Sequence, residues 1–281
     1  MTFPEIALIV SLSLVSAVLL VFSVWIFLVA PRIPSRCTAK YKSVHFAHRG
    51  LHGNGVVENS LTAFALAIEQ GYGIELDIRL SRSGELVVFH DESLKRVAGV
   101  DKRVIDLTTE ELRKTRLLGT EDTVPTFREV LAAVDGRVPL LIEIKMSPGE
   151  SGVAERFIEE IKDYQGDYIV ESFNPWALKT VRRARPDIPL GILAMAYMKI
   201  DKFRGKIAYR FLERLRLNFI VRPDFISYNY ADRGVMALVL LRKIFRVPTL
   251  AWTITSIDEQ REAFKCGFDS VIFEQYIPDN K

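Results

Sequence analysis

The sequence predicts an α/β protein, a (β/α)8 TIM barrel with a small insertion after its second strand, preceded by one N-terminal transmembrane helix. Three observations carry this prediction. Residues 6–30 form a 25-residue run without a charged side chain. The rest of the 281-residue chain has the length of one such barrel, which is typically about 250 residues. Along it, short β-rich apolar runs alternate with amphipathic stretches.

The composition is that of a globular protein, with 49% hydrophobic and 26% charged residues. The net charge of +3 is small, and no basic block of the kind that follows a nucleic-acid backbone occurs, so nucleic acid is not expected as a partner. Two cysteines, Cys37 and Cys266, exclude a framework of several disulfides.

The first element is the apolar run. About 20 apolar residues suffice to cross a bilayer, so we assign residues 1–31 to a transmembrane anchor. A cleaved signal peptide is the alternative, but it needs basic residues before the apolar run, and the charged residue there is Glu5.

A short linker, residues 32–42, follows Pro31 and carries four basic and no acidic side chains: Arg32, Arg36, Lys40 and Lys42. Because basic flanks stay on the cytoplasmic side, the sequence predicts a single-pass membrane protein whose catalytic domain, residues 43–281, is cytoplasmic. A basic domain at the anionic inner leaflet also makes membrane lipid an expected partner.

Eight runs are the candidate strands of the barrel, and an open doubly wound sheet is the alternative arrangement. They cover residues 44–48, 73–78, 140–145, 168–172, 190–194, 224–228, 249–253 and 270–273.

The strands bring chemistry-bearing side chains together. All four histidines (His45, His48, His52 and His90) fall within 46 residues, and His48 and Arg49 end the first strand, where barrel active sites lie. The two-residue period of a strand puts Glu75 and Asp77 on one face of the second strand, and Glu143 and Lys145 on one face of the third. Three carboxylates suit a hard cation, Mg²⁺ or Ca²⁺; an internal salt-bridge network around Lys145 is the alternative.

After the second strand, Ser83-Gly84 predicts a two-residue hairpin turn. With that turn Asp77 lies opposite His90, which brings the histidine to the carboxylates. Two histidines beside a cation and two basic side chains suit acid/base cleavage of an anion, and a phosphodiester meets these requirements.

These residues resemble the glycerophosphodiester phosphodiesterase family over about residues 44–277. The family pattern is followed in order by His48-Arg49-Gly50, residues 58–64, residues 73–78, residues 87–91, Pro125-Thr126-Phe127, Glu143-Ile144-Lys145 and Trp252-Thr253-Ile254, and residues 91–124 match the family's inserted segment. The resemblance implies the same barrel and hydrolysis of a glycerophosphodiester to glycerol 3-phosphate and an alcohol, or of a lysophospholipid to lysophosphatidate. Attack by water and attack by the neighbouring glycerol hydroxyl both stay open.

The resemblance also implies roles for single residues: an acid/base pair, His48 and His90; metal ligands, Glu75, Asp77 and Glu143; phosphate-binding side chains, Arg49 and Lys145; and pocket residues, Glu58 and Trp252. Where the family commonly has Thr-Asp-Tyr-Pro, this chain has Phe273-Glu274-Gln275-Tyr276, so Glu274 either acts in the pocket or only caps the barrel. A phosphoinositide-type phospholipase C and a non-catalytic lipid or glycerophosphodiester sensor are the alternative functions.

Residues 199–216 hold seven bases and two acids, with apolar residues every four positions, and predict an amphipathic helix. It is either an outer helix of the barrel or an interfacial helix that rests on anionic lipid.

Overall fold

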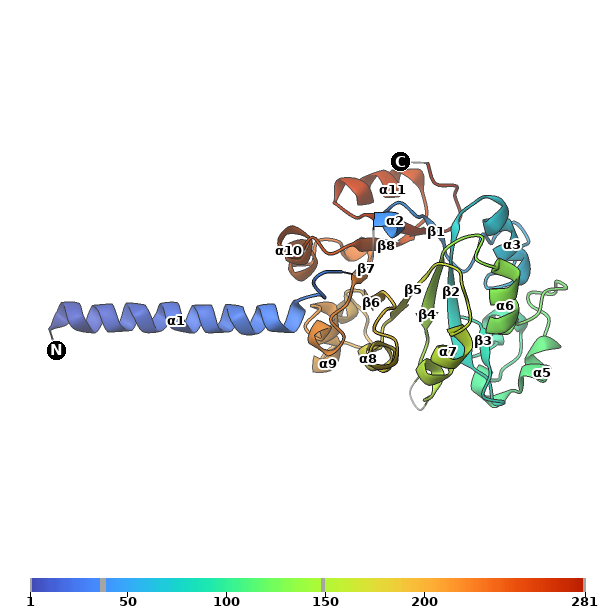
Figure 1. Cartoon of the computed structure of the whole chain (residues 1–281), viewed down its shortest axis with the longest axis horizontal. Helices are drawn as coiled ribbons and strands as arrows, with labels where there is room; N and C mark the ends of the chain where they lie inside the picture. Colours follow the sequence, from blue (N-terminus) through green and yellow to red (C-terminus); the bar gives the residue numbers. More distant parts are fainter. Residues whose placement is uncertain (1, 36–38, 148–149, 280–281) are drawn as a thin grey trace.

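Eight parallel strands close into a barrel, which confirms the predicted fold and excludes the open sheet. The computed structural model describes residues 2–35, 39–147 and 150–279 (Figure 1). The barrel order is β1-β2-β4-β5-β6-β7-β8-β9, and β1 pairs with β9 to close it. The strands are β1 (Phe46–Ala47), β2 (Gly73–Leu80), β4 (Leu140–Ile144), β5 (Tyr168–Ser172), β6 (Leu190–Ala194), β7 (Phe225–Asn229), β8 (Thr249–Ile254) and β9 (Ser270–Phe273).

Helices cover the outside of the barrel, because the outward-facing side chains of its strands are largely apolar and must be buried. Local capping fixes where several of them begin. Thr126 and Glu129 form a capping box at α6, and Ser60 caps α3. The outer helices are α3 (Leu61–Glu69), α6 (Phe127–Val134), α7 (Val153–Ile161), α8 (Pro175–Ala184), α10 (Met236–Phe245) and α11 (Ile257–Lys265), and the short α2 (Ala39–Lys42) lies before β1.

The hairpin after β2 has a different register from the predicted one. Strand β3 (Leu86–Val88) pairs antiparallel with β2, with Ile78 opposite Val88, so Asp77 faces Phe89 and not His90. The turn has three central residues. The Ser81 N–H donates to the carbonyl of Glu85 on the other side of the turn, and the Ser81 carbonyl accepts from the N–H of Gly84 within it. Gly84 has φ +77, a backbone conformation that glycine adopts at little cost. The predicted pairing of Asp77 with His90 was therefore wrong by one residue.

The predicted insertion is present after β3. It contains α4 (Lys95–Ala98), the 3-10 helix η1 (Val104–Asp106) and α5 (Thr109–Arg113). These elements bury a small core of their own, which includes Leu94, Val104 and Leu112. The insertion is thus a satellite of the barrel packed beside β3 and not a separate domain.

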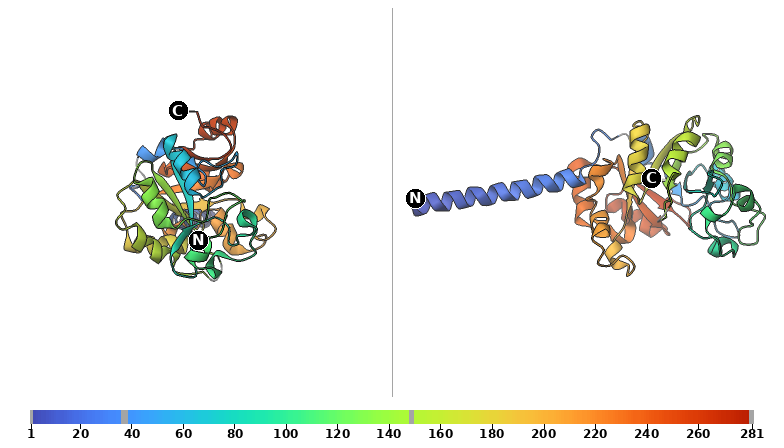
Figure 2. Two further views of the ribbon diagram at one scale, coloured as in Figure 1. Left: turned by 90° about the vertical axis from the view of Figure 1, so that its right-hand side faces the viewer. Right: turned by 90° about the horizontal axis from the view of Figure 1, so that it is seen from below.

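The apolar run forms one 27-residue helix, α1 (Phe3–Val29), long and apolar enough to span a membrane, and Figures 1 and 2 show it projecting from the barrel. Its last turn is bound to the barrel. The Asn218 side chain donates to the carbonyl of Val29 at 2.8 Å, and Arg222 donates to the carbonyls of Phe27 and Ala30. These side chains satisfy carbonyls that a helix end leaves free.

The segment 199–216 is not one amphipathic helix, which corrects that prediction. It contains the end of η2 (Tyr197–Lys199) and the short helix α9 (Ile207–Glu213), joined by turns, before the 3-10 helix η3 (Asn218–Ile220). Its predicted apolar stripe is split: Leu215 is buried, whereas Ile207 is 73% exposed. The remaining 3-10 helix, η4 (Tyr230–Asp232), follows β7.

Candidate active site

A small cavity of about 100 Å³ opens where the carboxyl ends of the barrel strands meet. Most of the strands contribute side chains to it, either from the strand itself or from the loop that follows. The lining includes His48 after β1, Glu75 from β2, Glu143 from β4, and Trp252 from β8.

Three carboxylates lie together beneath this cavity. One oxygen from each of Glu75, Asp77 and Glu143 lies within 4.8 Å of the others, and all three residues are buried. Burial, and then repulsion from Asp77 and Glu143, raises the pKa of Glu75 well above its usual value. Burial also raises the pKa of Glu143 to about 7. Such a cluster of oxygen donors can hold a divalent cation, which would relieve this repulsion.

Two basic side chains flank the carboxylates. The ammonium of Lys145 lies 2.8 Å from Glu143 and 3.1 Å from Asp77, and Arg49 lies 3.6 Å from Asp77. Burial alone would raise the pKa of Asp77, but Lys145, His90 and Arg49 together hold it well below its usual range. The salt-bridge network and the oxygen-donor cluster thus involve the same side chains.

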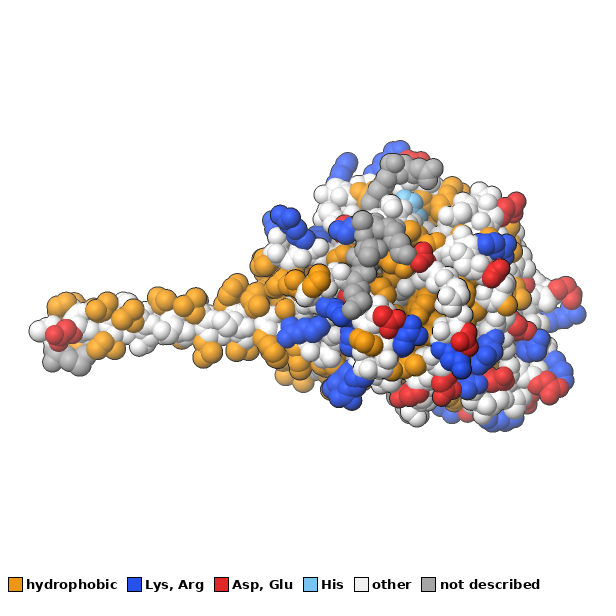
Figure 3. Space-filling model, in the orientation of Figure 1, with side chains coloured by type: hydrophobic (Ala, Val, Ile, Leu, Met, Phe, Trp, Pro, Cys, Tyr) orange, Lys and Arg blue, Asp and Glu red, His pale blue; other side chains and the backbone are white. Residues whose placement is uncertain are grey.

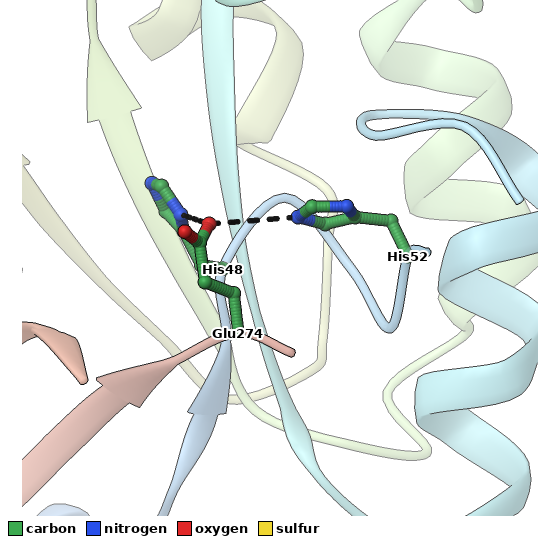
Figure 4. Close-up of side chains that lie close together, drawn as sticks. All are labelled: His48, His52 and Glu274. Atoms are coloured by element: carbon green, nitrogen blue, oxygen red, sulfur yellow. Dashed lines mark hydrogen bonds and ion pairs between the residues drawn. The ribbon is translucent and has the colours of Figure 1, made fainter. Parts of the chain in front are cut away.

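His48 is paired with Glu274, which directly follows β9 (Figure 4). The Nδ1 atom of His48 lies 2.7 Å from a carboxylate oxygen of Glu274, and Nε2 of His52 lies 3.7 Å from that same oxygen. Burial lowers the pKa of His48, and the Glu274 hydrogen bond partly offsets this. The two histidines in turn hold the pKa of Glu274 well below its usual range.

His90 has an equivalent carboxylate partner. Its Nδ1 atom lies 2.6 Å from Asp91, and Arg96 binds the other oxygen of Asp91 at 2.7 Å. Two donors of Arg79 hold the carbonyl of His90 at 2.9 and 2.8 Å, which fixes its backbone where β3 has ended. Burial lowers the pKa of His90 to about 4. His90 therefore reaches the cavity by this anchored loop and not by strand pairing.

The cavity thus combines two imidazoles, two cationic side chains and a carboxylate cluster, a set that suits acid/base cleavage of an anionic ester. Residues 48–276 match the Glycerophosphoryl diester phosphodiesterase family. The chain belongs to this family. It is a phosphoric diester hydrolase with glycerophosphodiester phosphodiesterase activity, as the sequence motifs predicted.

Relatives of the chain include proteins named as phosphodiesterases and as a lysophospholipase D. It is 29% identical to a glycerophosphodiester phosphodiesterase of Caldanaerobacter subterraneus subsp. tengcongensis over 82% of this chain and 93% of that protein. It is 29% identical to the human lysophospholipase D GDPD1 over 46% of this chain and 44% of that protein. A phosphodiesterase of Oleispira antarctica, solved with its product sn-glycerol-3-phosphate, has the same fold, with a TM-score of 0.68 and 24% identity over 84% of this chain and 94% of that one.

Most of the site residues predicted for this family member converge on the cavity. Its lining includes His48, Arg49, Glu75, His90, Glu143, Lys145 and Trp252. Asp77 lies behind that lining and is 1% exposed. Glu58 is not among the lining residues; it binds Arg49 and Arg96, each at 2.7 Å. Glu58 thus contacts the Arg49 guanidinium from outside the cavity lining.

One residue of this site, Glu171, and the partner of Glu274 were not found from the sequence. Glu171 of β5 lines the cavity, accepts a hydrogen bond from the Ser227 hydroxyl, and is buried so fully that its pKa rises to about 8. The two-residue period of β5 places Glu171 beside Glu143, and that pairing was the available signal. The pairing of Glu274 with His48 joins residues 226 positions apart and had no local signal.

Proposed function

We propose that His48 and His90 are the acid/base pair of the hydrolysis. The observation that supports this is their shared arrangement: each imidazole contacts a carboxylate through Nδ1, Glu274 for His48 and Asp91 for His90. A neutral imidazole whose Nδ1–H is bound in this way has Nε2 free to accept a proton. One imidazole would take the proton of the attacking water or glycerol hydroxyl. The other would have to be protonated, a form that its carboxylate partner favours, and would give its Nε2 proton to the leaving alcohol.

We further propose that Glu75, Asp77 and Glu143 bind the divalent cation, Mg²⁺ or Ca²⁺. Their donors are all oxygens, which both ions prefer. A bound cation would supply charge neutralisation at the phosphoryl oxygens. Arg49 and Lys145 line the same cavity and would bind the phosphate, with Glu58 holding the Arg49 guanidinium in position.

Trp252 is proposed to contact the glycerol part of the substrate. Its indole Nε1 is buried, and no partner for it lies within the described part of the chain. Because a buried donor without an acceptor is costly, a substrate oxygen is a suitable partner. The product bound in the Oleispira protein, sn-glycerol-3-phosphate, has the size and charge that this cavity suits.

The substrate range and membrane location are proposed as follows. Helix α1 spans the membrane once, residues 32–42 link it to the domain of residues 43–281, and that domain is cytoplasmic. Arg36, one of the four bases on which this orientation rests, lies outside the described residues. An enzyme held at a bilayer meets lysophospholipids there, and the human relative named lysophospholipase D supports them as substrates beside soluble glycerophosphodiesters.

The test is release of glycerol 3-phosphate or lysophosphatidate by the full chain in detergent, with Mg²⁺, Ca²⁺ or chelator. We expect His48→Ala and His90→Ala to lower kcat at least 100-fold, and Glu75→Ala to abolish stimulation by the metal. Lys114→Ala, at an exposed ion pair far from the cavity, is the control. Full activity in chelator would exclude the metal role, and unchanged turnover in both histidine variants would exclude the acid/base pair.

A further inference from the structure

A second, larger hollow lies beside the catalytic cavity, and we propose that it binds the acyl chain of a lysophospholipid; this inference rests on the proposed function. Its volume is about 700 Å³, within the roughly 300–1,000 Å³ range of ligand pockets. The side chains that line it are mostly apolar and aromatic, among them Phe173, Trp176, Met195, Tyr197, Tyr209 and Leu212. We call it the apolar groove.

The apolar groove borders the catalytic cavity at one shared residue. Phe173, in the loop after β5, lines both of them. Its ring lies edge-on to Trp252 of the catalytic cavity at 5.6 Å and edge-on to Tyr197 of the groove at 6.3 Å. A substrate whose phosphate is held at Arg49 and Lys145 would therefore extend past Phe173 into an apolar channel. A glycerophosphodiester ends at this point, whereas a lysophospholipid continues with an acyl chain.

The other end of the groove leads toward the membrane helix. Leu217 lines the groove, and the next residue, Asn218, donates to the carbonyl of Val29 at the end of α1. Helix α9 forms one wall through Ala208 and Leu212. Its last residue, Glu213, together with Arg214, lines a hollow that also includes Trp25 of α1. The groove thus extends from Phe173, at the catalytic cavity, toward the elements that contact the end of α1.

The surface around this end is suited to lipid. Exposed apolar side chains lie near the end of α1: Phe219, whose ring lies 5.8 Å from that of Phe27, is 38% exposed, and Met236, which lines a hollow with Trp25, is 68% exposed. Figure 3 shows hydrophobic side chains gathered along α1 and at its junction with the barrel. Such apolar surface next to a membrane helix favours contact with the bilayer over contact with water. A lipid with one acyl chain is therefore the occupant that matches both ends of the groove.

One buried polar group in the groove also fits this occupant. The hydroxyl of Tyr197 is buried, and no hydrogen-bond partner for it is found in the described ranges. Since a buried hydroxyl without a partner is costly, an ester carbonyl at the head of the acyl chain would be a favourable acceptor.

The test compares two substrates with the same headgroup on the full chain in detergent: 1-palmitoyl lysophosphatidylethanolamine and glycerophosphoethanolamine. Ala208→Trp places a large side chain in the groove from an exposed position of α9, so folding should survive. Ile207→Trp is the matched control, because the adjacent Ile207 is exposed and lies outside the groove lining. We expect Ala208→Trp to lower kcat/KM for the lysophospholipid at least tenfold and to change that for glycerophosphoethanolamine less than twofold.

Each other outcome has a defined meaning. If Ala208→Trp lowers neither value, or lowers both equally, the groove is not an acyl site and is free to bind a protein segment instead. If the parent chain cleaves glycerophosphoethanolamine but not the lysophospholipid, the acyl site is excluded while the phosphodiesterase remains. If the parent cleaves neither, the proposed substrates themselves are wrong. An equal loss in Ile207→Trp would show that α9, and not the groove, caused the effect.

Discussion

One carboxylate contacts each of the two histidines that we propose as the acid/base pair, and Glu274 offers the clearest test of this arrangement. In the described part of the chain, the Glu274 carboxylate contacts Nδ1 of His48 and, at a longer distance, Nε2 of His52. The backbone N–H of Glu274 donates to the carbonyl of Ile254. Glu274→Gln keeps the shape but weakens the preference for Nδ1–H on His48. We expect kcat to fall about 10–100-fold with KM changed less than twofold, and the pH dependence of kcat to shift.

Steady-state kinetics with glycerophosphodiester over pH 5–9 measures this split. His52→Asn removes the more distant imidazole, 3.7 Å away, and serves as the comparison; it should lower kcat by less than Glu274→Gln. A rise in KM with unchanged kcat in Glu274→Gln would instead place Glu274 in substrate binding.

Glu171 is the residue whose ionisation should most clearly affect stability. Its pKa is about 8 in the folded chain, against 4.5 in the unfolded one, so between these values the folded state binds more protons. The free energy of unfolding should therefore decrease as pH rises from about 5 to 8. Glu171→Gln mimics the neutral form of the side chain. At pH 8.5 its melting temperature should be about 5–10 °C above that of the parent, and at pH 5 most of this difference should disappear.

Thermal melting of both proteins in detergent and chelator measures this difference. Glu110→Gln, which neutralises an exposed carboxylate, is the matched control and should show no such pH dependence. If the melting temperature of Glu171→Gln exceeded that of the parent by the same amount at both pH values, Glu171 would be ionised in the folded chain from pH 5 to 8.5.

At the scale of elements, the β2–β3 hairpin depends on one backbone conformation. Gly84 has φ +77 and open space around its Cα, so Gly84→Ala creates strain without a clash. We expect it to lower the free energy of unfolding by about 1–2 kcal/mol, and Gly84→Asn to cost less because Asn tolerates this region. Because Arg79 fixes His90 independently, kcat should stay within twofold of the parent. Denaturant melts and kinetics on the two variants check this; a large loss of kcat would mean that the turn positions His90.

The sequence predicted those elements whose signals are local. Strands β5, β6 and β9 begin and end at the expected residues, and the period of two in β2 placed Glu75 beside Asp77. The hairpin register was missed because Ser83-Gly84 suits a two-residue and a three-residue turn alike. The helix predicted over residues 199–216 was too long. Apolar residues recur there every four positions, but this spacing does not reveal that Leu215 is buried while Ile207 is exposed. Both errors concern tertiary contacts that the local pattern does not encode.

At the scale of the whole molecule, the membrane helix and the barrel are joined at a defined contact. Arg222 donates to the carbonyls of Phe27 and Ala30, and its guanidinium lies over the Phe27 ring at 4.8 Å, so the last turn of α1 is held against the barrel. With α1 in the membrane as proposed, this contact would set how the apolar groove meets the bilayer. Arg222→Ala leaves α1 apolar but removes the contact, which would free the barrel to change its orientation relative to α1.

We therefore expect Arg222→Ala to lower turnover of lysophospholipid embedded in vesicles about three- to tenfold, because the groove end would no longer be held at the lipid surface. Turnover of soluble glycerophosphodiester should change less than twofold, and so should turnover of the same lysophospholipid in detergent, where no bilayer orients the barrel. Reconstitution of the full chain in vesicles with each substrate measures all three rates. Lys243→Ala, an exposed base on α10, controls for loss of charge near the membrane. An equal loss in detergent would assign Arg222 to folding, and unchanged rates in vesicles would show that α1 acts only as a tether.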